Sequence, residues 1–206
     1  DMDVNFLITA FFTLFVIIDP IGLTPLFVAL TQGMSPQKRR AIGIRACFIA
    51  ACILTAFSIF GEALLGFIGI SMHAFRIAGG ILLFLTALDM LFQRRTKRRE
   101  DQAEEDEGHD PSVFPIAIPL IAGPGSIATM ILLTGQTDRV LGYLSVLGVM
   151  LAALAIMLAL FFTGGVIEKA LGRTGINVVS RLLGMLLAAL SVQFVLDGLR
   201  GFGFAG

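Results

Sequence analysis

The sequence predicts an all-α membrane protein with six transmembrane helices, built as two inverted three-helix repeats. Hydrophobic residues make up 56% of the 206 residues and charged residues only 15%, which is more apolar surface than a soluble domain of this size can hide. The charged residues cluster and leave long apolar segments between them. The two halves of the chain also share residues at a nearly constant offset, which indicates an internal repeat.

Six apolar segments, each near or above the ~20 residues that cross a bilayer, are expected to form the spans. They cover residues 4–30, 41–60, 74–92, 113–133, 141–165 and 178–198. The first is the longest, as a helix that breaks and restarts would be. The chain is thus predicted to be one transmembrane domain over 1–206, with repeat A at 4–92, a linker at 93–112 and repeat B at 113–200.

The linker holds a basic block followed by an acidic block, RRTKRREDQAEEDEGHD over 94–110. We expect a solvated, flexible connection with its basic residues near lipid headgroups. Lys and Arg are retained on the cytoplasmic side of a membrane. With six spans, one side carries twelve of these residues and the other carries three. The linker is therefore predicted to be cytoplasmic, and both termini to lie on the periplasmic or extracellular face of a bacterial inner membrane.

Matching residues relate the second half of the chain to the first. Pro20 corresponds to Pro124 at an offset of 104, and Arg76 corresponds to Arg181 at an offset of 105. Each half has three spans, an odd number, so the halves are expected to lie in the membrane with opposite orientation, as in many secondary transporters. Chance similarity between apolar segments is the alternative.

Proline and glycine interrupt the first span of each half, in IIDPIGLTP and in PLIAGPGSI. Backbone groups freed by such breaks are costly in lipid, so the breaks are expected to lie inside the protein and to meet near the midplane around a solute site. Two purely structural kinks are the alternative. The predicted site residues are Asp19, Pro20, Gly22 and Pro25 in the first break and Gly123, Pro124, Gly125 and Ser126 in the second.

Four stretches carry a family resemblance: DPIGLTP at 19–25, RIAGGILLF at 76–84, IPLIAGPGSIAT at 118–129 and SRLLGMLLAALSVQFVLDGLR at 180–200. Together they resemble the MarC family of bacterial integral membrane proteins, over about residues 5–200. The resemblance implies six spans and a place among the LysE-like transporters and exporters. One archaeal relative is described as a small neutral amino-acid transporter, so a zwitterion such as alanine or glycine is the first substrate expected. The protein after which the family is named has Asn at the position of Asp19, so this sequence resembles an Asp-Pro branch of the family more closely.

Asp19 is the strongest candidate for a functional side chain. A carboxylate at mid-depth costs ~2.5–3.5 kcal/mol on insertion scales, so it must face a polar interior. There it can exchange a proton, or hold Na⁺ or a substrate ammonium, and no cofactor beyond such ion coupling is expected. The alternative is an N-cap for the restarted helix, because Asp followed by Pro suits a helix start.

Other polar residues occupy the third and sixth spans. Arg76 and Asp89 lie near the two ends of the third span, and Arg181 and Asp197 near those of the sixth. They are expected either to anchor the spans at the interface or to form inter-repeat salt bridges that gate the site. Gln193, inside the last span, is expected to line a path or to bond across helices.

Two other function classes compete with a transporter. An intramembrane enzyme would use Ser126 of GPGSIA, but its nucleophile needs a base, and the histidines are His73 at a helix end and His109 in the linker. We therefore expect no enzyme. A non-transporting partner or regulator, with a structural Asp19, is the other alternative. The lipid bilayer and a small solute are the expected partners; zero net charge gives no reason for a nucleic acid, and a homo-oligomer is left open.

Overall fold

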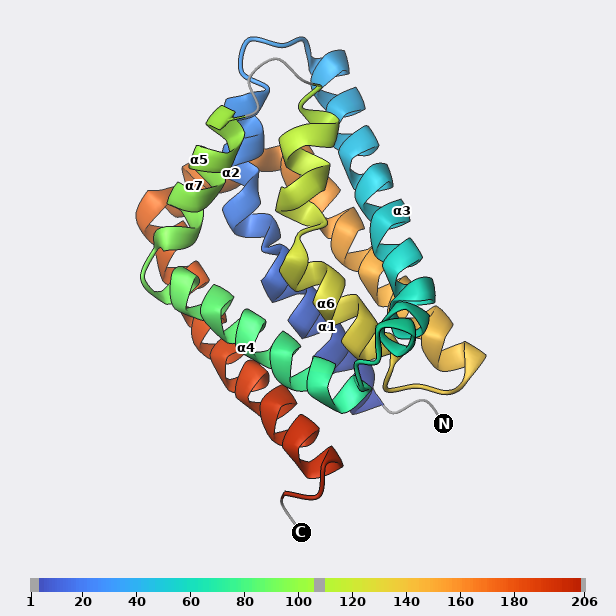
Figure 1. Cartoon of the computed structure of the whole chain (residues 1–206). Coiled ribbons are helices and arrows are strands. Elements are labelled where there is room, and N and C mark those ends of the chain that lie inside the picture. Colours follow the sequence, from blue (N-terminus) through green and yellow to red (C-terminus); the bar gives the residue numbers. More distant parts are fainter. Residues whose placement is uncertain (1–3, 106–109, 205–206) are drawn as a thin grey trace.

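The computed structural model describes residues 4–105 and 110–204, and every regular element in these ranges is a helix, as the sequence predicts. The elements are α1 (Val4–Ile18), α2 (Pro20–Leu30), α3 (Pro36–Ile68), α4 (Met72–Leu91), α5 (Arg94–Glu105), η1 (Ser112–Ile121), α6 (Pro124–Thr134) and α7 (Val140–Gly201). Figure 1 shows α1–α2 and η1–α6 in the middle of the bundle, with the longer helices around them. The two interrupted segments are thus the inner ones.

Four helical segments are long and apolar enough to cross a membrane. They are Val4–Leu30, Pro36–Ile68, Met72–Leu91 and Val140–Gly201. A fifth is obtained when η1 and α6, which are bent by 55° at their break, count as one span. The structure therefore supports an all-helical membrane protein with four or five candidate spans.

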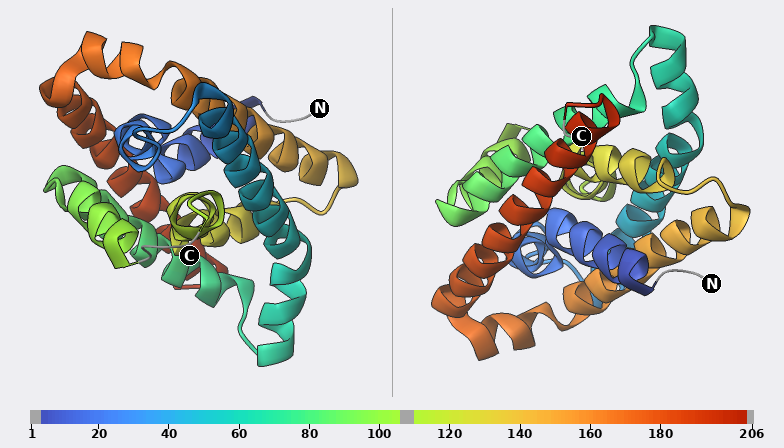
Figure 2. Two further views of the ribbon diagram at one scale, coloured as in Figure 1. Left: turned by 90° about the horizontal axis from the view of Figure 1, so that it is seen from above. Right: turned by 90° about the horizontal axis from the view of Figure 1, so that it is seen from below.

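The last element, α7, contains 62 residues and is interrupted at Gly172. Gly172 has φ 64° and ψ 174°, a conformation that side-chain-bearing residues rarely adopt. A straight helix of this length would measure about 93 Å, roughly three times the thickness of the hydrocarbon core. Figures 1 and 2 show that the chain instead turns back here, so that its final stretch runs beside α4.

Small residues allow α4 and the final stretch of α7 to approach closely. A Cβ atom added at Gly80 would lie 2.7 Å from the backbone oxygen of Ser191, so no larger residue fits there without moving one helix. Close approach through small residues is typical of helix pairs in membranes. The glycines of RIAGGILL therefore serve packing between helices.

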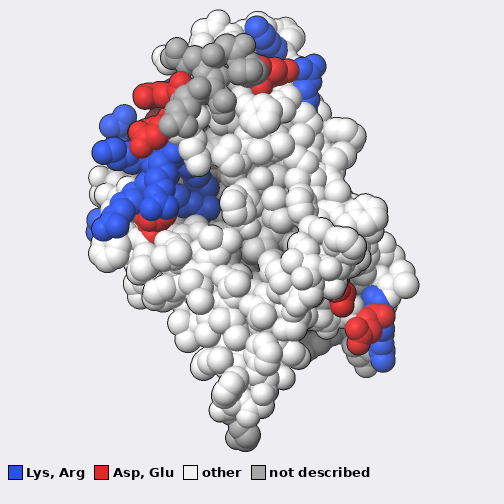
Figure 3. Space-filling model, in the orientation of Figure 1, with Lys and Arg blue, Asp and Glu red and all other residues white. Residues whose placement is uncertain are grey.

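Large apolar side chains point away from the bundle. Phe48 is 68% exposed, Phe60 65% and Phe67 91%, all on α3. In water such a surface would be unfavourable, whereas lipid tails accept it at no loss. Figure 3 shows the charged side chains of one face gathered toward two ends of the molecule, with a broad uncharged area between them.

The expected solvated, flexible linker is wrong for its basic block. Residues 94–105 form helix α5, which lies against α2, α4 and η1, and Arg99 in this helix is only 6% exposed. The physical reason is that the arginines find buried acceptors in the broken first span, as detailed below. Residues 106–109 of the acidic block, including His109, lie outside the described residues.

Candidate functional site

The first break is a single residue, Asp19, between α1 and α2. It has φ 56° and ψ 65°, in the left-handed region, and its Oδ1 accepts a hydrogen bond from the Gly22 N–H at 3.0 Å. Pro20 opens α2 at a position where no N–H is needed. Asp19 therefore caps α2, as the structural alternative predicts. A Cβ on Gly22 would lie 2.2 Å from the Asp19 Oδ2, so a larger residue there would displace the capping carboxylate.

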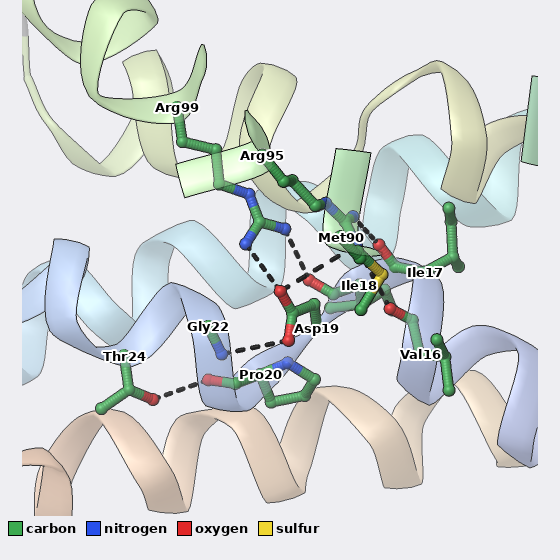
Figure 4. A network of polar contacts seen from close by, with 10 residues as sticks. All are labelled: Val16, Ile17, Ile18, Asp19, Pro20, Gly22, Thr24, Met90, Arg95 and Arg99. Carbon is green, nitrogen blue, oxygen red and sulfur yellow. Dashed lines mark hydrogen bonds and ion pairs between the residues drawn. The ribbon is translucent and has the colours of Figure 1, made fainter. Parts of the chain in front are cut away.

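Asp19 also forms a buried ion pair with α5. The Arg99 Nη1 lies 3.0 Å from the Asp19 Oδ2, and the Arg95 Nη1 lies 3.9 Å from the same oxygen (Figure 4). The side chains of Asp19 and Arg99 are 4% and 7% exposed. A buried charge is tolerated when it is paired and hydrogen-bonded. The candidate carboxylate is thus neutralised by a guanidinium eighty residues further along the chain.

The same arginines satisfy the end of α1. The last carbonyls of a helix receive no hydrogen bond from the helix itself. Here the side chains of α5 donate hydrogen bonds to them. Arg95 donates to the carbonyls of Ile17 and, at 3.4 Å, of Val16. Arg99 donates to the carbonyl of Ile18 at 3.2 Å. Helix α5 therefore caps α1 and neutralises the break at the same time.

Burial acts against the charge on these two guanidinium groups. It lowers the pKa of Arg95 to about 9; Arg99 lowers this pKa further, while Asp19 and Asp89 raise it. Burial likewise lowers the pKa of Arg99, and the Coulombic attraction and hydrogen bond of Asp19 oppose that change. Arginine stays charged in proteins, so α5 brings two positive charges to the break.

The second break separates η1 from α6. Within η1, Phe114 and Ile118 depart from helical dihedral angles. Ala122, at φ −87° and ψ 69°, and Gly123, at φ −98° and ψ 176°, then join it to α6 at an angle of 55°. The stretch 119–125 is therefore non-helical for part of its length, as the sequence predicts.

Ser126 holds this second break in shape. Its Oγ accepts a hydrogen bond from the Gly123 N–H at 3.0 Å and donates to the Ile121 carbonyl at 2.6 Å. The residue is 3% exposed. Its hydroxyl is therefore engaged by the backbone of its own turn. His73, considered above as a base for Ser126, packs against Phe202 with ring centroids 5.7 Å apart.

The structure brings the two breaks together. A Cβ on Gly125 would lie 2.8 Å from the Ile17 Cδ1, so the start of α6 touches the end of α1. A cavity of about 200 Å³ opens beside this contact, and its lining includes Gly123, Arg95 and Asp89. The predicted residues Pro124, Gly125 and Ser126 belong to the same lining.

A second cavity, of about 690 Å³, lies on the other side of α5. Gly22 and Pro25 of α2 line it, together with Glu168 and Arg173 from the region around Gly172. Arg99 borders both cavities. Helix α5 therefore stands between the two hollows that adjoin the first break.

The predicted gate residues do not pair across the repeats. Asp89 is 9% exposed and binds Arg98 of α5, with the Nη1 2.6 Å from the Oδ2. Within residues 4–105 and 110–204, no ion pair joins Arg76 or Arg181 to Asp89 or Asp197. The corresponding sequence positions of the two arginines do not bring them to a common acidic partner.

Gln193 likewise faces outward. It is exposed on α7, its Nε2 donates to the Asp197 Oδ1 at 2.8 Å, and Arg200 lies 3.9 Å from the same oxygen. It borders neither of the two cavities described above. These three residues form a local cluster along one helix face, apart from the breaks.

The arginines of α5 are the site residues that the sequence reasoning missed. Their spacing could have predicted a basic helix face, because positions 95, 98 and 99 lie three and four residues apart. A basic helix face of this kind is typical of a helix at a membrane surface, whereas here it meets the carbonyl oxygens at the end of α1.

Nearly the whole chain matches one known group of membrane proteins. The model of the MarC family of integral membrane proteins covers residues 4–202. The chain belongs to the MarC family. It is thereby an integral membrane protein, as the sequence predicts.

Several membrane proteins are similar to the chain over almost their full length. A UPF0056 membrane protein of Methanocaldococcus jannaschii is 37% identical, with 97% of this chain and 98% of the relative covered. The UPF0056 membrane protein YvbG of Bacillus subtilis is 35% identical, with 96% and 95% covered. The UPF0056 inner membrane protein YhgN of Escherichia coli is 33% identical, with 95% and 97% covered. No solved structure matches the chain.

Proposed function

We propose that this MarC family member is a secondary transporter of a small solute in the inner membrane. The observation that carries the proposal is the contact between two broken helices, at Asp19 and at Ala122–Gly123, beside cavities lined by charged groups. Paired discontinuous helices in the two halves of a chain are a recurrent design for solute sites in transporters. The Escherichia coli relative is named as an inner membrane protein, which supports the location.

The topology proposed for this function has six spans. It counts η1 and α6 as one broken span and divides α7 at Gly172 into two, each about 30 residues long. The two halves then form inverted repeats that move against each other around the breaks. The positive charges favour a cytoplasmic position for α5, with both termini on the opposite face.

The proposed solute is a small zwitterion such as a neutral amino acid. This choice rests on the family resemblance. Asp19 is the proposed coupling group, for H⁺ or Na⁺, and it must separate from Arg99 for part of the cycle because both partners are buried in the present arrangement. The backbone around Gly22 and Gly123–Gly125 is the proposed contact surface for the solute.

A non-transporting partner or regulator is the second candidate. The capping bond of Asp19 to Gly22 and its ion pair with Arg99 give the carboxylate a complete structural role. An enzymatic role has less support, since the Ser126 hydroxyl is engaged by the backbone of its own turn.

Flux into liposomes that contain only this protein tests the proposal. We expect uptake of at least one amino acid from a panel, driven by a pH or Na⁺ gradient. Asp19→Asn keeps the size and capping ability of the side chain and should lose coupled flux. Because it leaves the buried Arg99 without its counter-charge, Asp19→Asn/Arg99→Gln, which removes both charges, is tested beside it for expression level and flux. Normal, pH-dependent uptake by a well-folded Asp19→Asn protein would leave Asp19 as a helix cap. An absence of flux for every solute would favour the partner role.

A further inference from the structure

The end of α1 presents a group of oxygen atoms that accept and do not donate. They are the carbonyls of Val16, Ile17 and Ile18 and the carboxylate of Asp19. In Figure 4 these oxygens face α5, and dashed lines connect them to two guanidinium groups. Whatever takes the place of the guanidinium groups must bring positive charge, because the carboxylate is buried and would otherwise lack a counter-charge.

Helix α5 is held to the body by polar contacts. Of the α5 side chains that the structure describes, Arg99 alone is buried, and the sequence RRTKRREDQAEE offers Ala103 as its one aliphatic side chain. Hydrophobic stabilisation scales with apolar area, so little of it opposes the departure of α5. The ion pairs of Arg99 with Asp19 and of Arg98 with Asp89 attach the helix, together with the hydrogen bonds of Arg95 to the end of α1. Such contacts can be exchanged for others of the same charge.

The connection between α4 and α5 contains a residue that can act as a hinge when α5 moves away. Helix α4 ends at Leu91, and Gln93, at φ 58°, turns the chain into α5. A residue in the left-handed region at an element end is a usual place for a hinge to absorb backbone rotation. Departure of α5 would also remove Arg99 from between the two cavities that it borders, and so join them beside the first break.

We propose that α5 is a releasable plug, and that the oxygens it covers bind a small monovalent cation in exchange for its arginines. The inference takes the first break as the transport site and thus rests on the proposed function. One positive charge restores the balance around Asp19, and hard oxygen ligands suit an alkali cation. An alkylammonium group, with N–H donors for the same carbonyls, has the same chemistry. Binding of the cation and seating of α5 are then mutually exclusive.

Cation-dependent thermal unfolding of the purified full chain tests this exchange. The variant is Arg95→Gln/Arg99→Gln, and the matched control is Arg94→Gln/Lys97→Gln, which removes the same charge from exposed positions of the same helix. Each protein is titrated with NaCl, KCl or methylammonium chloride, with N-methyl-D-glucamine chloride keeping the ionic strength constant. The alkali and ammonium arms show which cation source the oxygens prefer.

We expect the apparent cation affinity of the variant to be about tenfold or more tighter than that of the wild type and the control. The reason is that a competent state populated to ~1–10% weakens the apparent affinity by the inverse of that fraction. Adding Asp19→Asn to the variant should abolish the cation effect. Equal titrations for the variant, control and wild type would overturn the inference, as would a cation effect that survives Asp19→Asn.

A distance measurement on the otherwise wild-type chain covers the case in which the variant fails to fold. Spin labels at Gln37→Cys and Gln102→Cys, in a Cys47→Ala/Cys52→Ser background, report the position of α5 relative to α3. We expect NaCl or methylammonium chloride to shift the distance distribution relative to the large organic cation. An identical distribution in all salts would overturn the exchange. Neither measurement depends on transport. A protein that binds cations but transports nothing would therefore contradict the proposed function and leave the cation exchange intact.

Discussion

Replacing Arg99 with glutamine removes one partner of the buried ion pair and leaves the other in place. Loss of a partner from such a pair costs about 3–5 kcal/mol, because an uncompensated charge remains inside the protein. Asp19 keeps its 3.0 Å hydrogen bond from Gly22, and Arg95 remains 3.9 Å away, so part of the charge is still balanced. We therefore expect Arg99→Gln to lower the free energy of unfolding by about 3 kcal/mol, at the low end of that range.

The assay is equilibrium unfolding in mixed micelles, followed by circular dichroism. Lys97→Gln is the control, because it removes one positive charge from an exposed position of the same helix and should change the free energy by less than about 0.5 kcal/mol. The double variant Asp19→Asn/Arg99→Gln should be destabilised by less than the sum of the two single changes. If Arg99→Gln matches Lys97→Gln, or if the two single effects simply add, the ion pair does not stabilise the break.

Three further predictions concern other parts of the chain. Single cysteines at Gln102 and Gly206, in a background lacking Cys47 and Cys52, should react with an impermeant thiol reagent outside intact cells at Gly206 only; labelling of Gln102 alone would reverse the topology. Gly80→Val should lower the melting temperature, with an overpacking penalty of about 1–3 kcal/mol, because a Cβ there already lies 2.7 Å from a backbone oxygen of α7. Gly22→Ala should cost ~1 kcal/mol or more in the free energy of unfolding, since it displaces the capping carboxylate, whereas Gly66→Ala, with open space around the added Cβ, should not.

The breaks were predictable because their causes are local. Proline removes a backbone donor and Asp-Pro suits a helix start, so the residues around Asp19 and Gly123 specify interruptions whatever surrounds them. The structure places the first interruption at Asp19 and the second at Ala122–Gly123, inside the predicted stretches.

The role of α5 was not predictable in the same way, because it depends on contacts far along the chain. A run of charged residues such as RRTKRRE can form a solvated linker or a helix that caps buried carbonyls. The choice depends on acceptors nearly eighty residues earlier, at Ile17 and Ile18. For the same reason the sequence match of Arg76 with Arg181 did not specify a contact, because corresponding positions in two halves of a sequence leave the partner of each side chain open.

The ion pair of the first break also constrains the order in which the protein is made. Asp19 leaves the ribosome 80 residues before Arg99, which at ~5–20 residues per second is about 4–16 s of synthesis. During that interval the first segment must partition into the bilayer with its carboxylate uncompensated or protonated, which for a charged group at the bilayer centre costs ~2.5–3.5 kcal/mol on insertion scales. Its neighbours on both sides of the break, rich in Phe, Leu, Ile and Val, favour partitioning and oppose that penalty. The first segment therefore acquires its final contacts at the break only after helix α5 has left the ribosome.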